Sequence, residues 1–226
     1  MRWIALDTET TGLNPLNGHR IVEIGCVVLD DNIPTGEEWH IYLNPERDVP
    51  EAAEAVHGLS SKFLSDKPLF KEISDELLSF LGDAELVIHN AKFDIGFLNN
   101  ELKLVNKPII NIENTIDTVI LARKTIPGAA ASLDALCKRF NIDLSRREKH
   151  GALLDAQLLA EVYLELTGGR QSSFRLAASE KNKKTHSSEN INIEIKKNTF
   201  EAKISDKEIK MHEELINKLK QAVWVK

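Results

Sequence analysis

Short apolar segments rich in β-branched residues alternate with turn signals over the N-terminal part of the chain. They cover residues 2–7, 21–30 and 37–45, and Asn44-Pro45 stops the last of them. The connections between these segments are too short for helical crossovers. The pattern therefore predicts three strands in an antiparallel meander.

Further along the chain, apolar residues recur at the spacing of amphipathic helices. A shorter apolar run, residues 84–90, is typical of a strand, and Ser132 is placed to cap the helix that follows it. The predicted helices cover residues 68–82, 91–105, 115–124, 133–141 and 152–169. Strands followed by strand–helix alternation predict an α/β domain with a mixed sheet.

The composition of the chain changes after Gly169. The residues that follow are rich in Lys, Asn and Ser, which is typical of a flexible linker. The last residues show an amphipathic helical pattern with one apolar stripe. This stripe consists of Met211, Leu215, Ile216, Leu219 and Val223. We therefore expect a folded domain over residues 1–170, a linker over residues 171–205 and a helix over residues 206–226.

The net charge of −6 is unevenly distributed over the 226 residues. Residues 171–226 contain 12 Lys and Arg against 8 Asp and Glu, so the preceding domain carries a balance of −10. Phosphate affinity comes mainly from Lys and Arg. If this domain handles nucleic acid, cations or a partner protein must therefore offset the repulsion.

The two cysteines, Cys26 and Cys137, lie far apart and outside any CxxC pattern. They predict buried thiols in a reducing compartment and not a disulfide framework. The charged N-terminus does not resemble a signal peptide, and no apolar run approaches the length of a membrane span. We therefore expect a cytoplasmic protein without a membrane association.

Asp7 and Glu9 directly follow the apolar run "WIAL". Side chains two apart on a strand share a face, so these carboxylates repel each other unless a cation lies between them. The alternative is a hairpin end in water, where both charges are harmless. Asp155 lies on or beside the apolar face of its predicted helix. Burying it is costly unless it binds metal or pairs with an Arg or Lys, and both alternatives stay open.

Asp94 and His150 are two further candidates for the same site. The strand before Asp94 would deliver it to the sheet end that holds Asp7 and Glu9, although the residue would also suit the first turn of a helix. His150 is expected in the loop before the helix of Asp155, where it is either a general base or a solvent-exposed histidine. Four carboxylates around one point suit two divalent cations about 3.5–4 Å apart, as used for phosphodiester cleavage.

Three motifs then resemble a known family. In order and spacing, "DTETTG", "HNAKFDIGFL" and "HGALLDA" resemble the exonuclease motifs of the DEDDh family of 3′→5′ exonucleases. "IVEIGCV", "VHGL" and "SLDALCKRF" extend the likeness, over about residues 2–169, to proofreading subunits of bacterial replicative DNA polymerases. The resemblance implies a ribonuclease-H-like exonuclease fold, which is a mixed five-stranded sheet flanked by helices, here with a C-terminal extension.

The resemblance also implies roles for individual residues. The metal ligands, for two Mg²⁺ or Mn²⁺ ions, would be Asp7, Glu9, Asp94 and Asp155, with His150 as the general base. Asp7, Glu9 and Asp155 would also contact the substrate. Positions around the terminal nucleotide would be Thr10, Thr11, His57 and Asn90, although His57 also suits a turn before Gly58. One position departs from the family: a substrate-contacting Glu is replaced by Ala52, so either the adjacent Glu51 takes over or the contact is lost.

The partners implied by the resemblance are the 3′ end of a DNA primer strand, the polymerase alpha subunit, the small theta subunit and the sliding clamp. The C-terminal helix would dock on the polymerase through Met211, Leu215, Leu219 and Trp224, unless it packs on its own domain. Gln171 and Phe174 in "QSSFRL" are similar to clamp-binding peptides, or begin a plain linker. Two other functions remain open: a DEDDh exoribonuclease, and a catalytically silent assembly subunit of the polymerase.

Overall fold

The computed structural model describes residues 2–31, 33–145, 147, 149–168, 207 and 210–212. The chain divides into two compact units, Met1–Leu176 and Ala177–Lys226. In the second unit, the described residues 207 and 210–212 are helical and Met211 is exposed. Most of the predicted linker and C-terminal helix, including Gln171, Phe174, Leu215, Leu219 and Trp224, lies outside the described residues.

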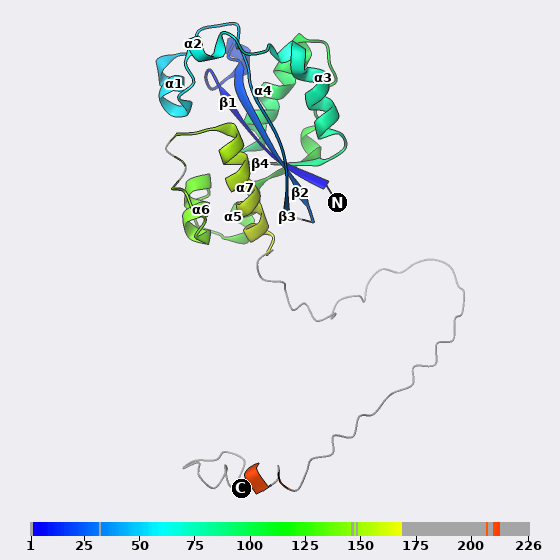
Figure 1. Ribbon diagram of the computed structural model, residues 1–226, viewed down its shortest axis with the longest axis vertical. Coiled ribbons are helices and arrows are strands. Elements are labelled where there is room, and N and C mark those ends of the chain that lie inside the picture. The colour runs from blue at the N-terminus through cyan, green and yellow to red at the C-terminus, as the bar shows by residue number, and fades with distance from the viewer. Residues whose placement is uncertain are drawn as a thin grey trace, which may run out of the picture. The chain divides into compact units, whose positions relative to one another are not determined.

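A five-stranded mixed sheet, in the order β3-β2-β1-β4-β5, forms the centre of the first unit (Figure 1). β1 pairs antiparallel with β2, and β2 with β3, so the predicted meander is confirmed. β4 is parallel to β1, and β5 is parallel to β4. The strands are β1 (Arg2–Thr10), β2 (Ile21–Asp30), β3 (Ile33–Tyr42), β4 (Glu85–Ile88) and β5 (Thr115–Asp117).

Helices cover both faces of this sheet (Figure 1). On one face, Leu6 and Ile88 pack with the helices α3 and α4, and on the other Ala5 and Val87 pack with α5, α6 and α7. The helices are α1 (Glu51–His57), α2 (Ser61–Leu64), α3 (Phe70–Leu81), α4 (Ala91–Leu104), α5 (Thr118–Thr125), α6 (Leu133–Phe140) and α7 (Ala152–Leu166), with the 3-10 turns η1 (Pro15–Asn17) and η2 (Ile112–Asn114).

Several element boundaries differ from the sequence-based expectation. The helix predicted from residue 115 is wrong over its first three residues, which form β5. There the Asp117 side chain accepts hydrogen bonds from the amides of Val119 and Ile120 and so starts α5 only after the strand. β1 continues to Thr10, and β3 begins earlier and ends at Tyr42. The predicted cap is confirmed, since the Ser132 side chain accepts a hydrogen bond from the Ala135 amide.

Gly25 explains how closely α7 can cross the sheet. It pairs with Asp7 in the β1–β2 register, and a Cβ at this position would lie 2.3 Å from the backbone of Ala152. No side chain fits in that space, so a glycine in β2 lets the first turn of α7 lie directly over the strand. The start of α7 is thereby held beside the end of β1.

The prediction of two buried thiols is confirmed. Cys26 and Cys137 are buried and carry free thiols. Among the residues that the structure describes, none of the helices combines the length and the apolar character needed to span a bilayer.

Candidate metal and active site

The two carboxylates at the end of β1 point to the α7 side of the sheet. Asp7 and Glu9 alternate with Leu6 and Thr8, so they share the face on which Ala5 packs against the α5–α7 layer. Asp7 is half-buried, and Glu9 is 9% exposed. The predicted sharing of one face is therefore observed.

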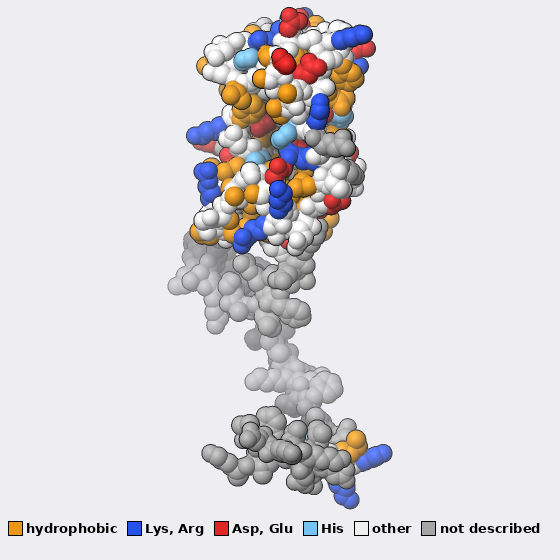
Figure 2. All heavy atoms as spheres, turned by 90° about the vertical axis from the view of Figure 1, so that its left-hand side faces the viewer, with side chains coloured by type: hydrophobic (Ala, Val, Ile, Leu, Met, Phe, Trp, Pro, Cys, Tyr) orange, Lys and Arg blue, Asp and Glu red, His pale blue; other side chains and the backbone are white. Residues whose placement is uncertain are grey.

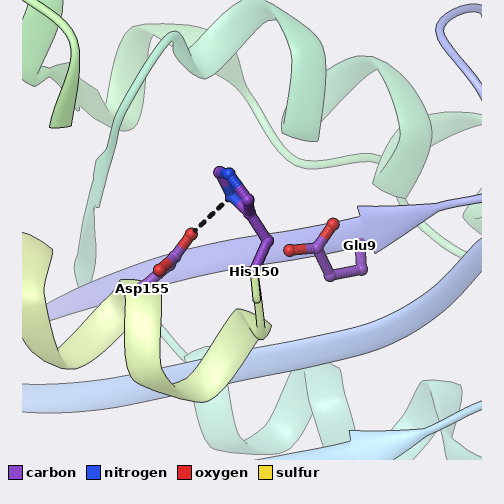
Figure 3. A group of neighbouring side chains, drawn as sticks. All are labelled: Glu9, His150 and Asp155. Atoms are coloured by element: carbon purple, nitrogen blue, oxygen red, sulfur yellow. Dashed lines mark hydrogen bonds and ion pairs between the residues drawn. The ribbon is translucent and has the colours of Figure 1, made fainter. Parts of the chain in front are cut away.

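Asp155 reaches the same place from the first turn of α7. The residue is 3% exposed, and its amide donates a hydrogen bond to the Gly151 carbonyl oxygen. His150 lies just before the helix, in the loop where it was expected, and its ring is about half exposed. Its Nδ1 lies 3.1 Å from Oδ2 of Asp155. Ligand atoms of Glu9, His150 and Asp155 all lie within 4.8 Å of one another (Figure 3).

Asp94 comes from the first turn of α4 and is held against the other side of β1. Its Oδ1 accepts hydrogen bonds from the Thr8 amide (3.0 Å) and the Thr8 hydroxyl (2.7 Å). Burial raises the pKa of Asp94 to about 7, although the bonds from Thr8 oppose the rise. Its charge is close enough to raise the pKa of Asp7.

The acidic groups repel one another. Burial raises the pKa of Asp7 well above its ordinary value, and the charges of Asp94, Asp155 and Glu9 raise it further. Burial, assisted by the charge of Asp155, raises the pKa of Glu9 to about 8. Either bound protons or a cation must relieve this repulsion, and carboxylate oxygens are ligands that suit Mg²⁺ or Mn²⁺. The residues present therefore fit a divalent metal site.

Two charged residues at this site were missed from the sequence. Arg147 makes a bidentate ion pair with Asp155, its Nε and Nη2 each lying 2.6 Å from a carboxylate oxygen. Glu23 pairs with Glu9 in the β1–β2 register, is 3% exposed and lies 2.7 Å from the His40 ring. Glu23 stands opposite Glu9 on the same face of the sheet, so alternation along β2 could have revealed it, whereas no periodicity in the sequence marks Arg147.

A cavity of about 550 Å³ opens beside Glu9. Thr10, Thr11 and His57 line it, as do apolar side chains that include Val56 and Phe93. Figure 2 shows histidine and acidic side chains gathered midway along this unit among hydrophobic ones. Within the described part of the chain, the buried Nε2 of His57 has no hydrogen-bond partner, and burial lowers the pKa of this ring.

The two remaining substrate candidates are not brought to this cavity. Ala52 lines it, but the neighbouring Glu51 is exposed and is not among the lining residues. The contact of Glu51 with substrate therefore stays a prediction from the sequence. Asn90 precedes α4 in a left-handed conformation (φ 68°), a geometry that Asn tolerates better than most residues. It lies outside the cavity lining but directly before the helix that carries Asp94.

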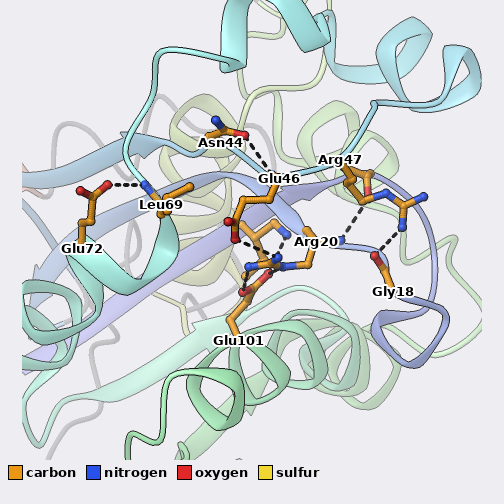
Figure 4. Close-up of polar contacts among 10 residues, drawn as sticks. Gly18, Arg20, Asn44, Glu46, Arg47, Leu69, Glu72 and Glu101 are labelled. Atoms are coloured by element: carbon orange, nitrogen blue, oxygen red, sulfur yellow. Dashed lines mark hydrogen bonds and ion pairs between the residues drawn. The ribbon is translucent and has the colours of Figure 1, made fainter.

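An internal ion pair holds the cavity-lining segment after β1 (Figure 4). Nε and Nη2 of Arg20 lie 2.7 and 2.8 Å from the two oxygens of Glu101, whose side chain is 1% exposed. The backbone of Arg20 in turn donates to the Thr11 hydroxyl and accepts from the Thr11 amide. A buried bidentate pair of this kind is costly to break, so it fixes Thr11 at the cavity wall.

Comparisons with known proteins agree on one family. The sequence pattern of the RNase T exonuclease family matches residues 4–163. The chain is 47% identical to the DNA polymerase III subunit epsilon of Rickettsia felis, over 97% of each chain. It is 50% identical to the DNA polymerase III subunit epsilon of Escherichia coli K12, over 76% of this chain and 73% of that one.

Solved structures show the same fold. Exonuclease X in complex with 5′-overhanging duplex DNA matches with a TM-score of 0.57 and 27% identity, over 74% of this chain and 90% of that one. The nuclease domain of 3′hExo, a DEDDh family member bound to rAMP, matches with a TM-score of 0.64 over 74% of this chain and 92% of that one. At 15% identity the second likeness concerns the fold alone. The expected mixed five-stranded exonuclease fold is thus confirmed.

Proposed function

Because this chain belongs to the exonuclease family of DNA polymerase III epsilon subunits, we propose that its acidic site removes mismatched 3′-terminal nucleotides from DNA by metal-dependent hydrolysis. The observation that carries the proposal is the convergence of Glu9, His150 and Asp155, whose ligand atoms lie within 4.8 Å of one another. Asp7 and Asp94 complete the set, since the charges of Asp94 and Asp155 both act on Asp7.

The four acids would hold two divalent cations, Mg²⁺ or Mn²⁺. When bound, such ions supply positive charge to the attacking and leaving oxygens of a phosphodiester. Contacts within the protein hold two of these ligands in position. Thr8 orients Asp94 through two hydrogen bonds, and the close crossing over Gly25 sets Asp155 above the strand end. Both contacts use rigid elements, which favours a fixed ligand geometry.

His150 would accept a proton from the attacking water. Its half-exposed ring stands beside Glu9 and Asp155, within reach of both ligand oxygens and solvent. Nδ1 faces Asp155 and Arg147, at 3.1 and 2.8 Å. A ring protonated at Nδ1 would donate to Asp155 and leave Nε2 free to accept a proton, whereas the Arg147 guanidinium can donate only to an unprotonated Nδ1.

The cavity beside Glu9 would take the terminal nucleotide. Its volume of about 550 Å³ lies in the range of small-molecule sites, and its wall combines apolar side chains with a few polar groups. Phe93 and Val56 offer apolar surface to a base, while Thr10, Thr11 and the unpartnered His57 Nε2 offer hydrogen bonds. Asn90 would act from outside the cavity. Glu51 would supply the contact missing at Ala52 only after a local shift, and otherwise that contact is lost.

The direct test is hydrolysis of a primer–template duplex carrying a 3′ mismatch. With Mg²⁺ or Mn²⁺ the full chain is expected to release nucleoside 5′-monophosphates, faster from the mismatched end than from a matched one, and EDTA should stop release. Chromatography of the products measures both rates. Preference for short RNA would favour the exoribonuclease, and no metal-dependent release would favour the silent assembly subunit.

The partners follow from the same assignment. We propose that the polymerase alpha subunit binds the segment of residues 206–226, for which the sequence predicts an amphipathic helix and in which Met211 is exposed. The theta subunit and the sliding clamp, the latter through Gln171 and Phe174, remain predictions from the sequence. An amphipathic helix gains affinity by burying its apolar face in a partner's groove.

Deletion of the chain from Lys207 onward is expected to abolish co-purification with the alpha subunit. Hydrolysis of the mismatched primer should persist, because the ligands and the cavity all lie in the first unit. Lys210→Ala is the matched control, since it removes an exposed charge from the same segment and leaves the apolar stripe intact. Unchanged co-purification of the truncated chain would contradict the docking proposal.

A further inference from the structure

Asp155, the carboxylate in the first turn of α7, forms an ion pair with Arg147. We propose that Arg147 is an internal counter-ion of the metal site, which a divalent cation displaces from Asp155 and which Asp134 then retains. This inference rests on the proposed function of the acidic site. It concerns how the negative charge of that site is balanced when no metal ion is bound.

The geometry shows direct competition for Asp155. Arg147 Nε lies 2.6 Å from Oδ1, and Nη2 lies 2.6 Å from Oδ2, so both carboxylate oxygens are engaged. Both side chains are largely buried, at 9% and 5% exposure. A cation that binds Asp155 must either break these bonds or share the carboxylate with a fixed positive charge, and both options oppose its binding.

Asp134 supplies a second anchor outside the acidic cluster. It stands in the first turn of α6, two residues after the N-cap Ser132, and its Oδ1 makes an ion pair with Nη1 of Arg147. Half of the Asp134 side chain is exposed, so this acid gains little from binding a metal but can keep a displaced guanidinium in place. The same arginine also contacts His150 Nδ1 at 2.8 Å, so its displacement frees the proposed base as well.

The direction in which metal affinity changes when Arg147 is removed distinguishes a counter-ion from a residue that only supports the structure. If Arg147 only holds Asp155 in shape, its removal disorders a ligand and weakens metal binding. If Arg147 is a counter-ion, its removal deletes the competitor, and metal binding tightens. Arg147→Met keeps the apolar stem and removes the charge, and we expect the Kd for Mn²⁺ to fall by about tenfold.

Asp134→Asn should act in the opposite direction. Without its second anchor, the guanidinium depends on Asp155 alone, so its displacement is costlier and the Kd for Mn²⁺ should rise. In the double variant Arg147→Met with Asp134→Asn, the effect of Asp134 should vanish, because no guanidinium remains to be retained. Arg139→Met is the matched control, since that arginine is exposed on α6 and should leave the Kd unchanged.

The experiment is calorimetric titration of the full chain with Mn²⁺ alone, without nucleic acid, together with the rise in Tm that Mn²⁺ causes. Arg147→Lys guards against poor folding of the Met variant, and it should bind Mn²⁺ with an intermediate Kd. Weaker binding in both Arg147 variants, or an unchanged Kd, would overturn the inference. A wild-type chain that does not bind Mn²⁺ at all, or an Asp155→Asn variant that binds it equally well, would instead count against the proposed function.

Discussion

Asp155→Asn is expected to lower the rate of 3′-nucleotide removal by about 10³-fold at saturating DNA and metal. The amide has the shape of the carboxylate but lacks the charge that holds a cation. It also leaves the Arg147 guanidinium without its bidentate partner, beside the reacting groups. The loss should therefore appear in kcat and in the Kd for Mn²⁺ together, with circular dichroism showing the fold intact.

The matched control is Asp83→Asn. Asp83 is exposed in the turn before β4, so it lies at the opposite end of that parallel strand from the acidic site. This change also removes one negative charge from the chain, and it should leave kcat and the Kd for Mn²⁺ unaltered. If Asp155→Asn retained a rate within threefold of the wild type, the acid would be a structural partner of Arg147 and not a metal ligand.

Local periodicity explains why the main acids could be found from the sequence. Period two on β1 puts Asp7 and Glu9 on one face, and helical spacing puts Asp155 beside the apolar face of α7. Both inferences need only the neighbouring residues. For Asp155 the sequence left open a metal or an ion pair, and the structure shows the ion pair with Arg147.

Arg147 could not be found in the same way. It lies in the segment between α6 and α7, where no period ties the direction of a side chain to its place in the chain. Whether it reaches Asp155 depends on the path of that loop. β5 was missed for a related reason, because three residues are too few to show alternation and directly precede a helix. Glu51 is adjacent to Ala52 in the sequence, but successive side chains on a helix point in different directions. Ala52 lines the cavity and Glu51 does not.

The acidic cluster also predicts how stability depends on pH when no metal is present. Burial and neighbouring acids raise the pKa of folded Glu9 from 4.5 to about 8. Between these values the unfolded chain releases a proton that the folded chain keeps, so the free energy of unfolding falls as the pH rises through this window. Asp7 and Asp94 have raised pKa values and act in the same direction.

Glu9→Gln should therefore stabilise the metal-free protein at pH 8–9, by a few kcal/mol at most, while removing a ligand that hydrolysis needs. Urea unfolding in EDTA at pH 5, 7 and 9 measures the effect, and the variant and the wild type should converge at pH 5. Glu113→Gln, in the turn before β5, is an exposed control that should show no such divergence.

Added Mn²⁺ should reverse the trend in the wild type, because the ion binds the deprotonated acids and its stabilisation grows as the pH rises. In Glu9→Gln that gain should shrink. A wild-type chain whose metal-free stability rose steadily from pH 5 to pH 9 would show that these carboxylates ionise without mutual repulsion. The cluster would then have no need of a cation, and the physical basis for a metal site at the end of β1 would be lost.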